Sequence, residues 1–406
     1  MTLEFHKLTQ QIEQMGSYLA AREDEAADKL ELAWQIMEAY SSEEFLPLIL
    51  ERVADALAKD AGYRGARPID EPIMNTYPPA QLPPSATILA TDGSQIAPNP
   101  HGADFYYLIN TGTIVLHHGS GEPPEVICEP FLYYEDEHLR LPDRGPITGA
   151  TVAARRTVAE MSALAEQTWL RRGEPRPLVA LLDNPLLPFG IGKEVPERDE
   201  LQNIYLSAIS RLLETRALLA GYTDRPRSRY VVGLLHLLSL EPENVNRTTL
   251  ATDGRLEGLE DKALFHYLLR PGERSALFVQ MSPLNKEFKS RAGETHEIAF
   301  FYLNTAAPGQ APTLARVEIP MWVAEDRRAI AELQALLYHQ CHQVASRYPY
   351  VLTRAHELAL IKSDEARQLN VIIEVAMARY GVAAEESEKQ LGKAAVGRRR
   401  TRFEVH

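Results

Sequence analysis

The chain has 406 residues, of which 45% are apolar and 24% are charged, and its formal net charge is −13. These fractions are typical of globular proteins and exclude disordered and fibrous classes. The acidic balance excludes a protein that coats nucleic acid through its overall charge. Two cysteines are too few for a disulfide framework. With no secretion-signal pattern and no run of about 18 apolar residues, we expect a cytoplasmic protein without membrane contact.

The charge is unevenly distributed along the chain. Residues 1–70 carry 7 basic and 14 acidic side chains, whereas residues 393–406 carry 5 and 1. Clustered basic groups are compatible with a confined channel that admits an acidic ligand, even in a protein of negative net charge. Net charge therefore does not exclude an enzyme that acts on nucleic acid.

The first part of the chain is predicted to be helical. Apolar residues recur at three- and four-residue steps over residues 3–40, which indicates one long helix or two consecutive ones. A capping-box pattern at 41–44 opens a further helix that runs to about Lys59. Four prolines within residues 78–84 then indicate a linker. We therefore predict an N-terminal helical region over residues 1–75.

After the linker, predicted strands and helices alternate. Residues 105–110 and 113–117 flank Thr111 and Gly112, which predicts a hairpin turn. Apolar runs predict strands at 86–91, 177–182, 230–237, 297–303 and 314–319, and helical spacing predicts helices at 148–171, 197–220, 258–270, 324–347 and 354–380. This order predicts an α/β domain with a mixed sheet over residues 85–385, with helices at its C-terminal end and a flexible basic tail at 386–406.

Two predicted strands end in an aspartate, Asp92 and Asp183. Ligands of open α/β sheets bind beyond the carboxyl ends of the strands, so the two carboxylates meet at one site if their strands are neighbours. Converging carboxylates suit Mg²⁺ or Mn²⁺, which take oxygen ligands and hold phosphates. The alternative is that these residues only start turns or cap helices.

The helix predicted at 148–171 offers a third carboxylate. Glu160 and Glu166 lie about 240° apart around its axis, so both cannot serve one site. Glu160 lies nearer the apolar stripe and is preferred, although a helical glutamate is commonly just a solvated side chain. His356 lies near the start of another predicted helix. Four roles remain open for it: a metal ligand, a phosphate contact, a proton shuttle, or a structural group at the helix terminus.

Six segments taken in order resemble the NurA nuclease family over residues 86–375. They are Asp92-Gly93-Ser94, the strand that ends at Asp183, 221–228, 268–275, 316–320, and Tyr348-Pro-Tyr with Ala355-His356-Glu357. No single motif is specific, but chance does not explain six in the right order. One difference is that the family commonly has Asp-Gly-Ser at the second strand end, whereas this chain has Asp183-Asn184-Pro185. The carboxylate is kept while the turn differs.

The resemblance implies an RNase H-like core and a toroidal homodimer. It implies a nuclease that depends on manganese, Mn²⁺ (or Mg²⁺), and acts on single-stranded DNA and on 5′ ends. The implied partner is a hexameric HerA-type ATPase, and the implied process is end resection in double-strand break repair. Residue by residue, the family site maps onto Asp92, Glu160, Asp183 and His356 as metal ligands, with Tyr348 eight residues before the histidine.

Basic clusters offer contacts for DNA phosphates. The candidates are Arg155, Arg156, Arg225, Arg227 and Arg274. The alternative for each is a solvated side chain or an ion pair. Two other functions stay open: a non-catalytic subunit that guides DNA for such an ATPase, and a metal-dependent enzyme that cleaves RNA.

Overall fold

The computed structural model describes residues 5–98, 106–141, 145–174, 177–345 and 347–381. Its contacts divide the chain into two units. The first unit contains Met1–Pro83, Asn184–Leu187 and Leu218–Pro349, and the second contains Pro84–Asp183, Pro188–Ala217 and Tyr350–His406. The predicted basic tail at 386–406 lies outside the described residues.

The second unit is built on a mixed four-stranded sheet. Its strands are β3 (Ala86–Ile96), β4 (Tyr107–His118), β5 (Glu125–Tyr133) and β6 (Leu178–Leu182), in the order β5-β4-β3-β6. The β3–β4 and β4–β5 pairs are antiparallel, whereas β3 and β6 are parallel, with Thr91 opposite Leu182. The predicted strands at 86–91 and 177–182 are confirmed, and they are neighbours.

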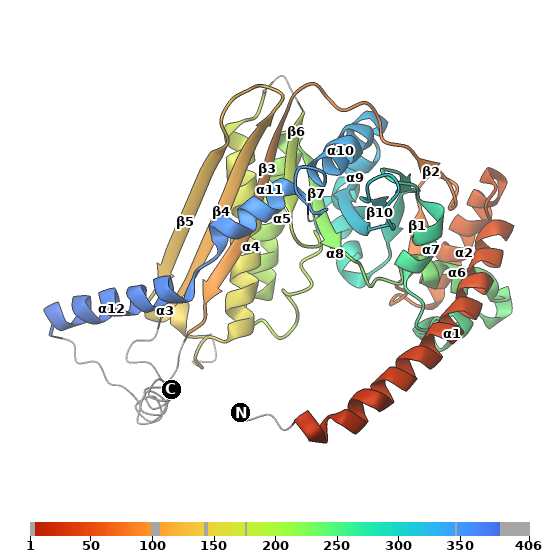
Figure 1. The fold of residues 1–406 in the computed structure, drawn as a ribbon, viewed down its shortest axis with the longest axis horizontal. Coiled ribbons are helices and arrows are strands. Elements are labelled where there is room, and N and C mark those ends of the chain that lie inside the picture. The colour runs from red at the N-terminus through yellow and green to blue at the C-terminus, as the bar shows by residue number, and fades with distance from the viewer. Residues whose placement is uncertain (1–4, 99–105, 142–144, 175–176, 346, 382–406) are drawn as a thin grey trace, which may run out of the picture. The chain divides into compact units, whose positions relative to one another are not determined.

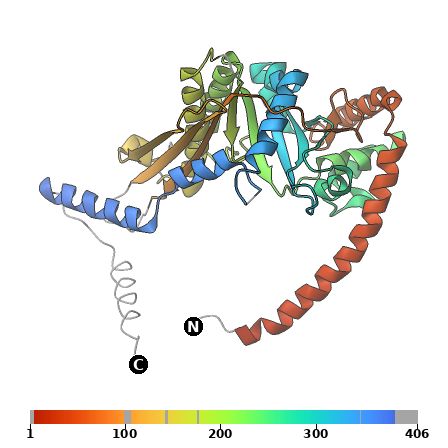
Figure 2. The same ribbon diagram turned by 45° about the horizontal axis from the view of Figure 1, so that its top comes forward.

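Helices cover both faces of this sheet. The helices of the second unit are α3 (Asp136–Leu139), α4 (Gly149–Leu170), α5 (Arg198–Glu214), α11 (Tyr350–Ala359) and α12 (Ser363–Arg379). Figures 1 and 2 show α4 and α5 on one face and α11 on the other. Three antiparallel strands followed, after a helix, by a strand parallel to the first is the arrangement of an RNase H-like core. The predicted fold class is confirmed.

The predicted hairpin turn at Thr111 and Gly112 is wrong. Both residues lie within the continuous strand β4, where they pair with Gly93 and Asp92 of β3. A Cβ atom on Gly112 would lie 2.5 Å from the backbone nitrogen of Ala359. Glycine is therefore required here because α11 packs directly on the strand, and not because the chain turns.

The first unit has an antiparallel sheet in the order β7-β11-β10-β9-β1. These strands are β7 (Leu218–Asp224), β11 (Leu314–Pro320), β10 (Ile298–Asn304), β9 (Phe278–Gln280) and β1 (Ala66–Pro68), while β2 (Thr76–Tyr77) and β8 (Arg274–Ser275) pair beside β10. Its helices are α1 (Thr9–Ala39), α2 (Leu46–Lys59), α6 (Tyr230–Ser239), α7 (Asp261–Leu268), α8 (Pro283–Ala292), α9 (Met321–Ala324) and α10 (Arg327–Gln340). Both α1 and α2 pack on α6, so the N-terminal helices belong to this unit.

Three further element predictions are corrected. The strand predicted at 230–237 is helix α6, because an apolar run without alternation does not distinguish a buried strand from a buried helix. The helix predicted at 197–220 ends at Glu214, and β7 follows after Arg216, whose φ of 56° breaks the helix. The helix predicted at 354–380 is divided into α11 and α12. Across the described part of the chain, every helix is too short or too polar to cross a lipid bilayer.

Candidate active site

The C-terminal half of β3 presents successive side chains to opposite faces of the sheet, as any strand does. Asp92 faces α11, where the Nδ1–H of His356 donates to Asp92 Oδ2 at 2.8 Å. The next residue, Gly93, faces α4, and its backbone N–H donates to Asp92 Oδ1 at 2.7 Å. Both carboxylate oxygens of Asp92 are thus held at the strand end, one of them by a side chain from a distant part of the sequence.

Two side chains of the sheet fix the end of α11 and so place His356. The amide nitrogen of Asn110 donates to the carbonyl of Ala359 at 2.8 Å, and the Ser94 hydroxyl donates to the same oxygen. His356 lies one helical turn before this anchored carbonyl. Ser94 and Asn110 were absent from the sequence-based site, since their role depends on a helix more than 240 residues away.

Glu160 reaches the same strand end from α4, on the opposite face. Its side chain is 3% exposed, whereas Glu166, on the same helix, is exposed. Burial raises the pKa of Glu160 to about 8; the Arg156 guanidinium opposes this increase, and the negative charges of Asp92 and Asp183 add to it. The sequence left open which helical glutamate joins the aspartates, and the structure places Glu160 with them.

The donor set fits a hard divalent cation. Glu160 Oε1 is buried and makes no well-aligned hydrogen bond to any described residue. Its cationic neighbour is Arg156, whose Nε lies 3.1 Å away, and a buried carboxylate beside two further acids is costly unless cations compensate all three. Asp92 lies within β3 and Asp183 directly after β6, and each follows one member of the last pair between these parallel strands, Thr91 and Leu182. Three carboxylates and an imidazole are ligands that Mn²⁺ and Mg²⁺ accept.

Substitution of Gly93 by alanine should disturb this arrangement. The new Cβ would lie 2.6 Å from Glu160 Oε1 and 3.0 Å from the Cγ of Arg156. We expect overpacking to lower the free energy of unfolding by about 1–3 kcal/mol, measured by denaturant or thermal unfolding. The control is Gly149→Ala at the start of α4, where a Cβ meets nothing within 4 Å. Equal stability of the two variants would contradict the close approach of Glu160 to β3.

Tyr348, the remaining predicted site residue, belongs to the first unit. Its ring packs edge-to-face on Tyr222 with 5.2 Å between the ring centroids. Its proposed role in catalysis therefore stays a prediction.

The five arginines predicted to contact DNA differ in their surroundings. Arg155 donates to both carboxylate oxygens of Glu197 at 2.9 and 2.6 Å, and Arg274 is 4% exposed and forms a two-point ion pair with Glu71. Their guanidinium groups are engaged in ion pairs within the protein, and their contact with DNA stays a prediction. Arg225 and Arg227 are exposed in the first unit, and Arg156 lies beside Glu160.

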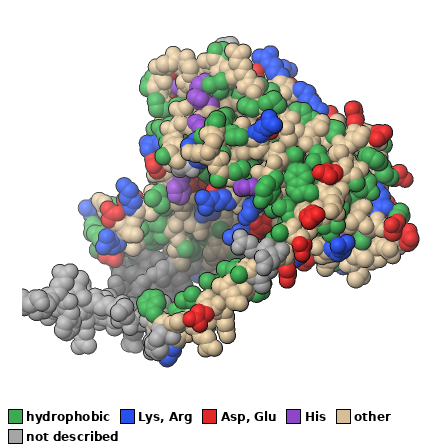
Figure 3. Space-filling view, turned by 45° about the vertical axis from the view of Figure 1, so that its right-hand side comes forward, with side chains coloured by type: hydrophobic (Ala, Val, Ile, Leu, Met, Phe, Trp, Pro, Cys, Tyr) green, Lys and Arg blue, Asp and Glu red, His purple; other side chains and the backbone are tan. Residues whose placement is uncertain are grey.

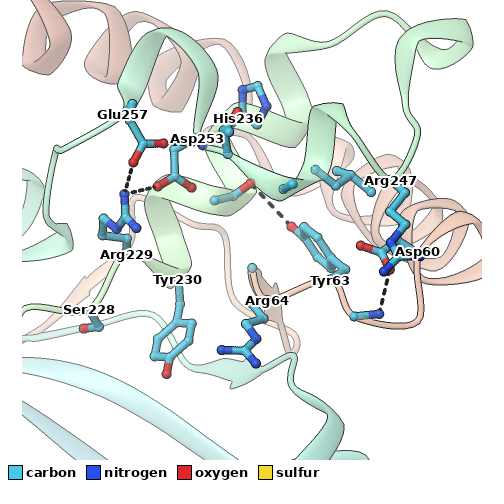
Figure 4. Close-up of a pocket in the computed structure, with 16 residues that line it drawn as sticks. Asp60, Tyr63, Arg64, Ser228, Arg229, Tyr230, His236, Arg247, Asp253 and Glu257 are labelled. Carbon is cyan, nitrogen blue, oxygen red and sulfur yellow. Dashed lines mark hydrogen bonds and ion pairs between the residues drawn. The ribbon is translucent and has the colours of Figure 1, made fainter.

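Two other groupings of polar side chains were not predicted. A pocket of about 630 Å³ in the first unit is drawn in Figure 4. There, Arg229 makes ion pairs with Asp253 at 2.8 Å and with Glu257 at 2.6 Å, so both acids share one cationic partner. In the second unit, Glu135, Glu137 and His138 cluster on an exposed surface. Within the described part of the chain, neither grouping has a buried carboxylate oxygen without a hydrogen bond, whereas the Asp92 site has one in Glu160 Oε1.

The face of the molecule drawn in Figure 3 shows no broad basic patch. On the face drawn in Figure 3, Lys and Arg side chains are interspersed with Asp and Glu. This agrees with the formal net charge of −13. Phosphate binding by this chain must therefore depend on local contacts.

The family model of the NurA domain matches residues 86–361, which is more than half of the chain. No curated protein matches the chain. Among solved structures, the NurA nuclease from Sulfolobus solfataricus aligns over 90% of this chain and 97% of its own, with 12% identity and a TM-score of 0.48. The catalytic domain of human endonuclease V aligns over 81% of this chain and 98% of its own, with 16% identity and a TM-score of 0.32. On the strength of the family model, the chain belongs to the NurA nuclease family.

Proposed function

We propose that the chain is a metal-dependent deoxyribonuclease that cleaves single-stranded DNA and degrades DNA from 5′ ends. The proposal rests on one observation. Asp92, Glu160 and Asp183 converge where β3 and β6 lie side by side, and His356 is hydrogen-bonded to Asp92. Clustered carboxylates repel one another, and a cation that also holds a phosphate relieves this repulsion. Family membership supports nucleic acid as the substrate.

In the proposed mechanism, Asp92, Glu160, Asp183 and His356 hold Mn²⁺ or Mg²⁺. When bound, the ion supplies charge stabilisation to the reacting phosphate and lowers the pKa of water. Asp92 Oδ2 accepts a hydrogen bond from His356 Nδ1–H, which fixes the orientation of the ring. His356 is 62% exposed at its side chain, so Nε2 is positioned to ligate the ion or to accept a proton from a reactant.

The partner and process are also part of the proposal. We propose that a hexameric HerA-type translocase delivers DNA to a homodimer of this chain for end resection in double-strand break repair. The acidic net charge and the mixed surface in Figure 3 support this division of labour, because unaided DNA binding is expected to be weak and sensitive to salt.

A cleavage assay tests the function. Labelled single-stranded DNA, duplex DNA with 5′ ends and RNA are each incubated with the purified chain, with Mn²⁺, Mg²⁺ or a chelator, and with or without the translocase. We expect DNA cleavage that needs the metal and increases with the translocase. No cleavage under any condition would favour the non-catalytic DNA-guiding subunit, and cleavage of RNA alone would favour a ribonuclease.

A further inference from the structure

Arg156 lies beside the carboxylate cluster of Asp92, Glu160 and Asp183, and its Nε atom is buried. It precedes Glu160 by one turn of α4, and its Nε lies 3.1 Å from Glu160 Oε1. Both atoms are buried, and neither makes a well-aligned hydrogen bond to any described residue. A Cβ placed on Gly93 would approach both side chains, at 2.6 Å for Glu160 Oε1 and 3.0 Å for Arg156 Cγ. The two side chains therefore pack together over the strand that carries Asp92.

The neighbouring Arg155 has a structural role, because it ties α4 to other elements. Arg155 binds Glu197 through two nitrogens and also donates to the carbonyl of His138. Arg156, in contrast, has Glu160 as its one ion-pair partner among the described residues, and its side chain remains 33% exposed. Arg156 thus acts on Glu160 and does not tie the helix to another element.

The contact between Arg156 and Glu160 is an electrostatic one between opposite charges. Burial raises the pKa of Glu160, the negative charges of Asp92 and Asp183 raise it further, and Arg156 is the positive group that opposes them. A divalent cation at the same carboxylate would lie within a few ångströms of the guanidinium. Two cations at that distance repel each other strongly in a partly buried site. The guanidinium and the metal ion therefore do not both bind Glu160 Oε1 tightly at the same time.

We propose that Arg156 is a positioning residue that occupies Glu160 in the metal-free protein and competes with the divalent cation for this carboxylate. Binding of the cation displaces the guanidinium toward solvent, where it becomes available to a phosphate. This inference rests on the proposed metal-dependent function and concerns the regulation of that same site.

The test is Mn²⁺ affinity without DNA, measured from the paramagnetic resonance signal of the free ion. Arg156→Gln should bind Mn²⁺ roughly three- to tenfold more tightly than the wild type, because a repelling charge is removed. Arg156→Lys keeps the charge and should stay close to the wild type. All variants are compared at one pH in oxygen-free buffer. The matched control is Arg172→Gln, at an exposed arginine that lies over Trp169 just after α4, and it should have no effect.

A double-mutant cycle separates direct competition from a general charge effect. In a Glu160→Gln background, Arg156→Gln should leave Mn²⁺ affinity unchanged, because the contested carboxylate is gone. A folded Arg156→Gln variant with equal or weaker affinity, or a gain that persists in the Glu160→Gln background, would overturn the role of Arg156. If the wild type itself binds no Mn²⁺, the metal-dependent function fails, and the inference fails with it.

Discussion

Replacing Asp92 by asparagine should reduce DNA cleavage by about three orders of magnitude without unfolding the protein. The substitution removes the negative charge of the carboxylate and keeps one of the two oxygens that accept from His356 Nδ1–H and from the Gly93 amide. Loss of about 4 kcal/mol of charge stabilisation corresponds to roughly a thousandfold in rate. Initial rates of cleavage with saturating Mn²⁺ measure the effect, and Asp183→Asn should behave alike.

The control for this prediction is Asp136→Asn in the same unit. Asp136 is exposed and paired with Arg140 four residues along, so its removal should leave both activity and stability near the wild type. Cleavage that survives in both Asp92→Asn and Asp183→Asn would place the reaction elsewhere in the chain.

Replacing Glu160 by glutamine should stabilise the metal-free protein at alkaline pH while abolishing its cleavage activity. The folded-state pKa of about 8 lies above the ordinary value of 4.5, so the folded protein holds a proton that the unfolded chain has already lost. The stability that this proton provides is complete below about pH 4.5 and is lost as the pH rises through 8. Glutamine removes this dependence, which should raise the melting temperature at pH 9 by roughly 5–10 °C in the presence of a chelator.

Thermal unfolding between pH 4.5 and 9 measures this effect. Glu166→Gln on the same helix is the matched control, since Glu166 is exposed and should leave the pH profile unchanged. Mn²⁺ should stabilise the wild type most above pH 8 and should stabilise Glu160→Gln less. Identical pH profiles for the wild type and Glu160→Gln would show that Glu160 is not a buried, charged group.

The sequence predicted the strand-end aspartates because their position follows from local pattern. Asp92 and Asp183 each follow an apolar run, and the two runs form adjacent parallel strands, with β4, β5 and α4 in the connection between them. Glu160 was preferred over Glu166 from its place beside the apolar stripe of the helix, a periodicity that the burial of α4 reproduces. These features depend on spacing within about 100 residues.

Features that depend on distant partners could not be predicted. Arg274 pairs with Glu71, 203 residues earlier, and no local pattern indicates this ion pair. Gly112 signals a turn in local sequence, yet its requirement comes from Ala359 of α11. Helix α6 contains an apolar run that fits a strand equally well, and packing against α1 and α2 decides its form. The Arg156–Glu160 contact is different, because four-residue spacing in a helix is a signal that sequence reasoning had available.

Anomalous diffraction from crystals soaked in Mn²⁺ would locate the ion among these side chains. We expect a peak within coordination distance of carboxylate oxygens from Asp92, Glu160 and Asp183, with the Arg156 guanidinium moved away from Glu160. A peak only at the exposed Glu135, Glu137 and His138 cluster, with Arg156 still on Glu160, would contradict this expectation.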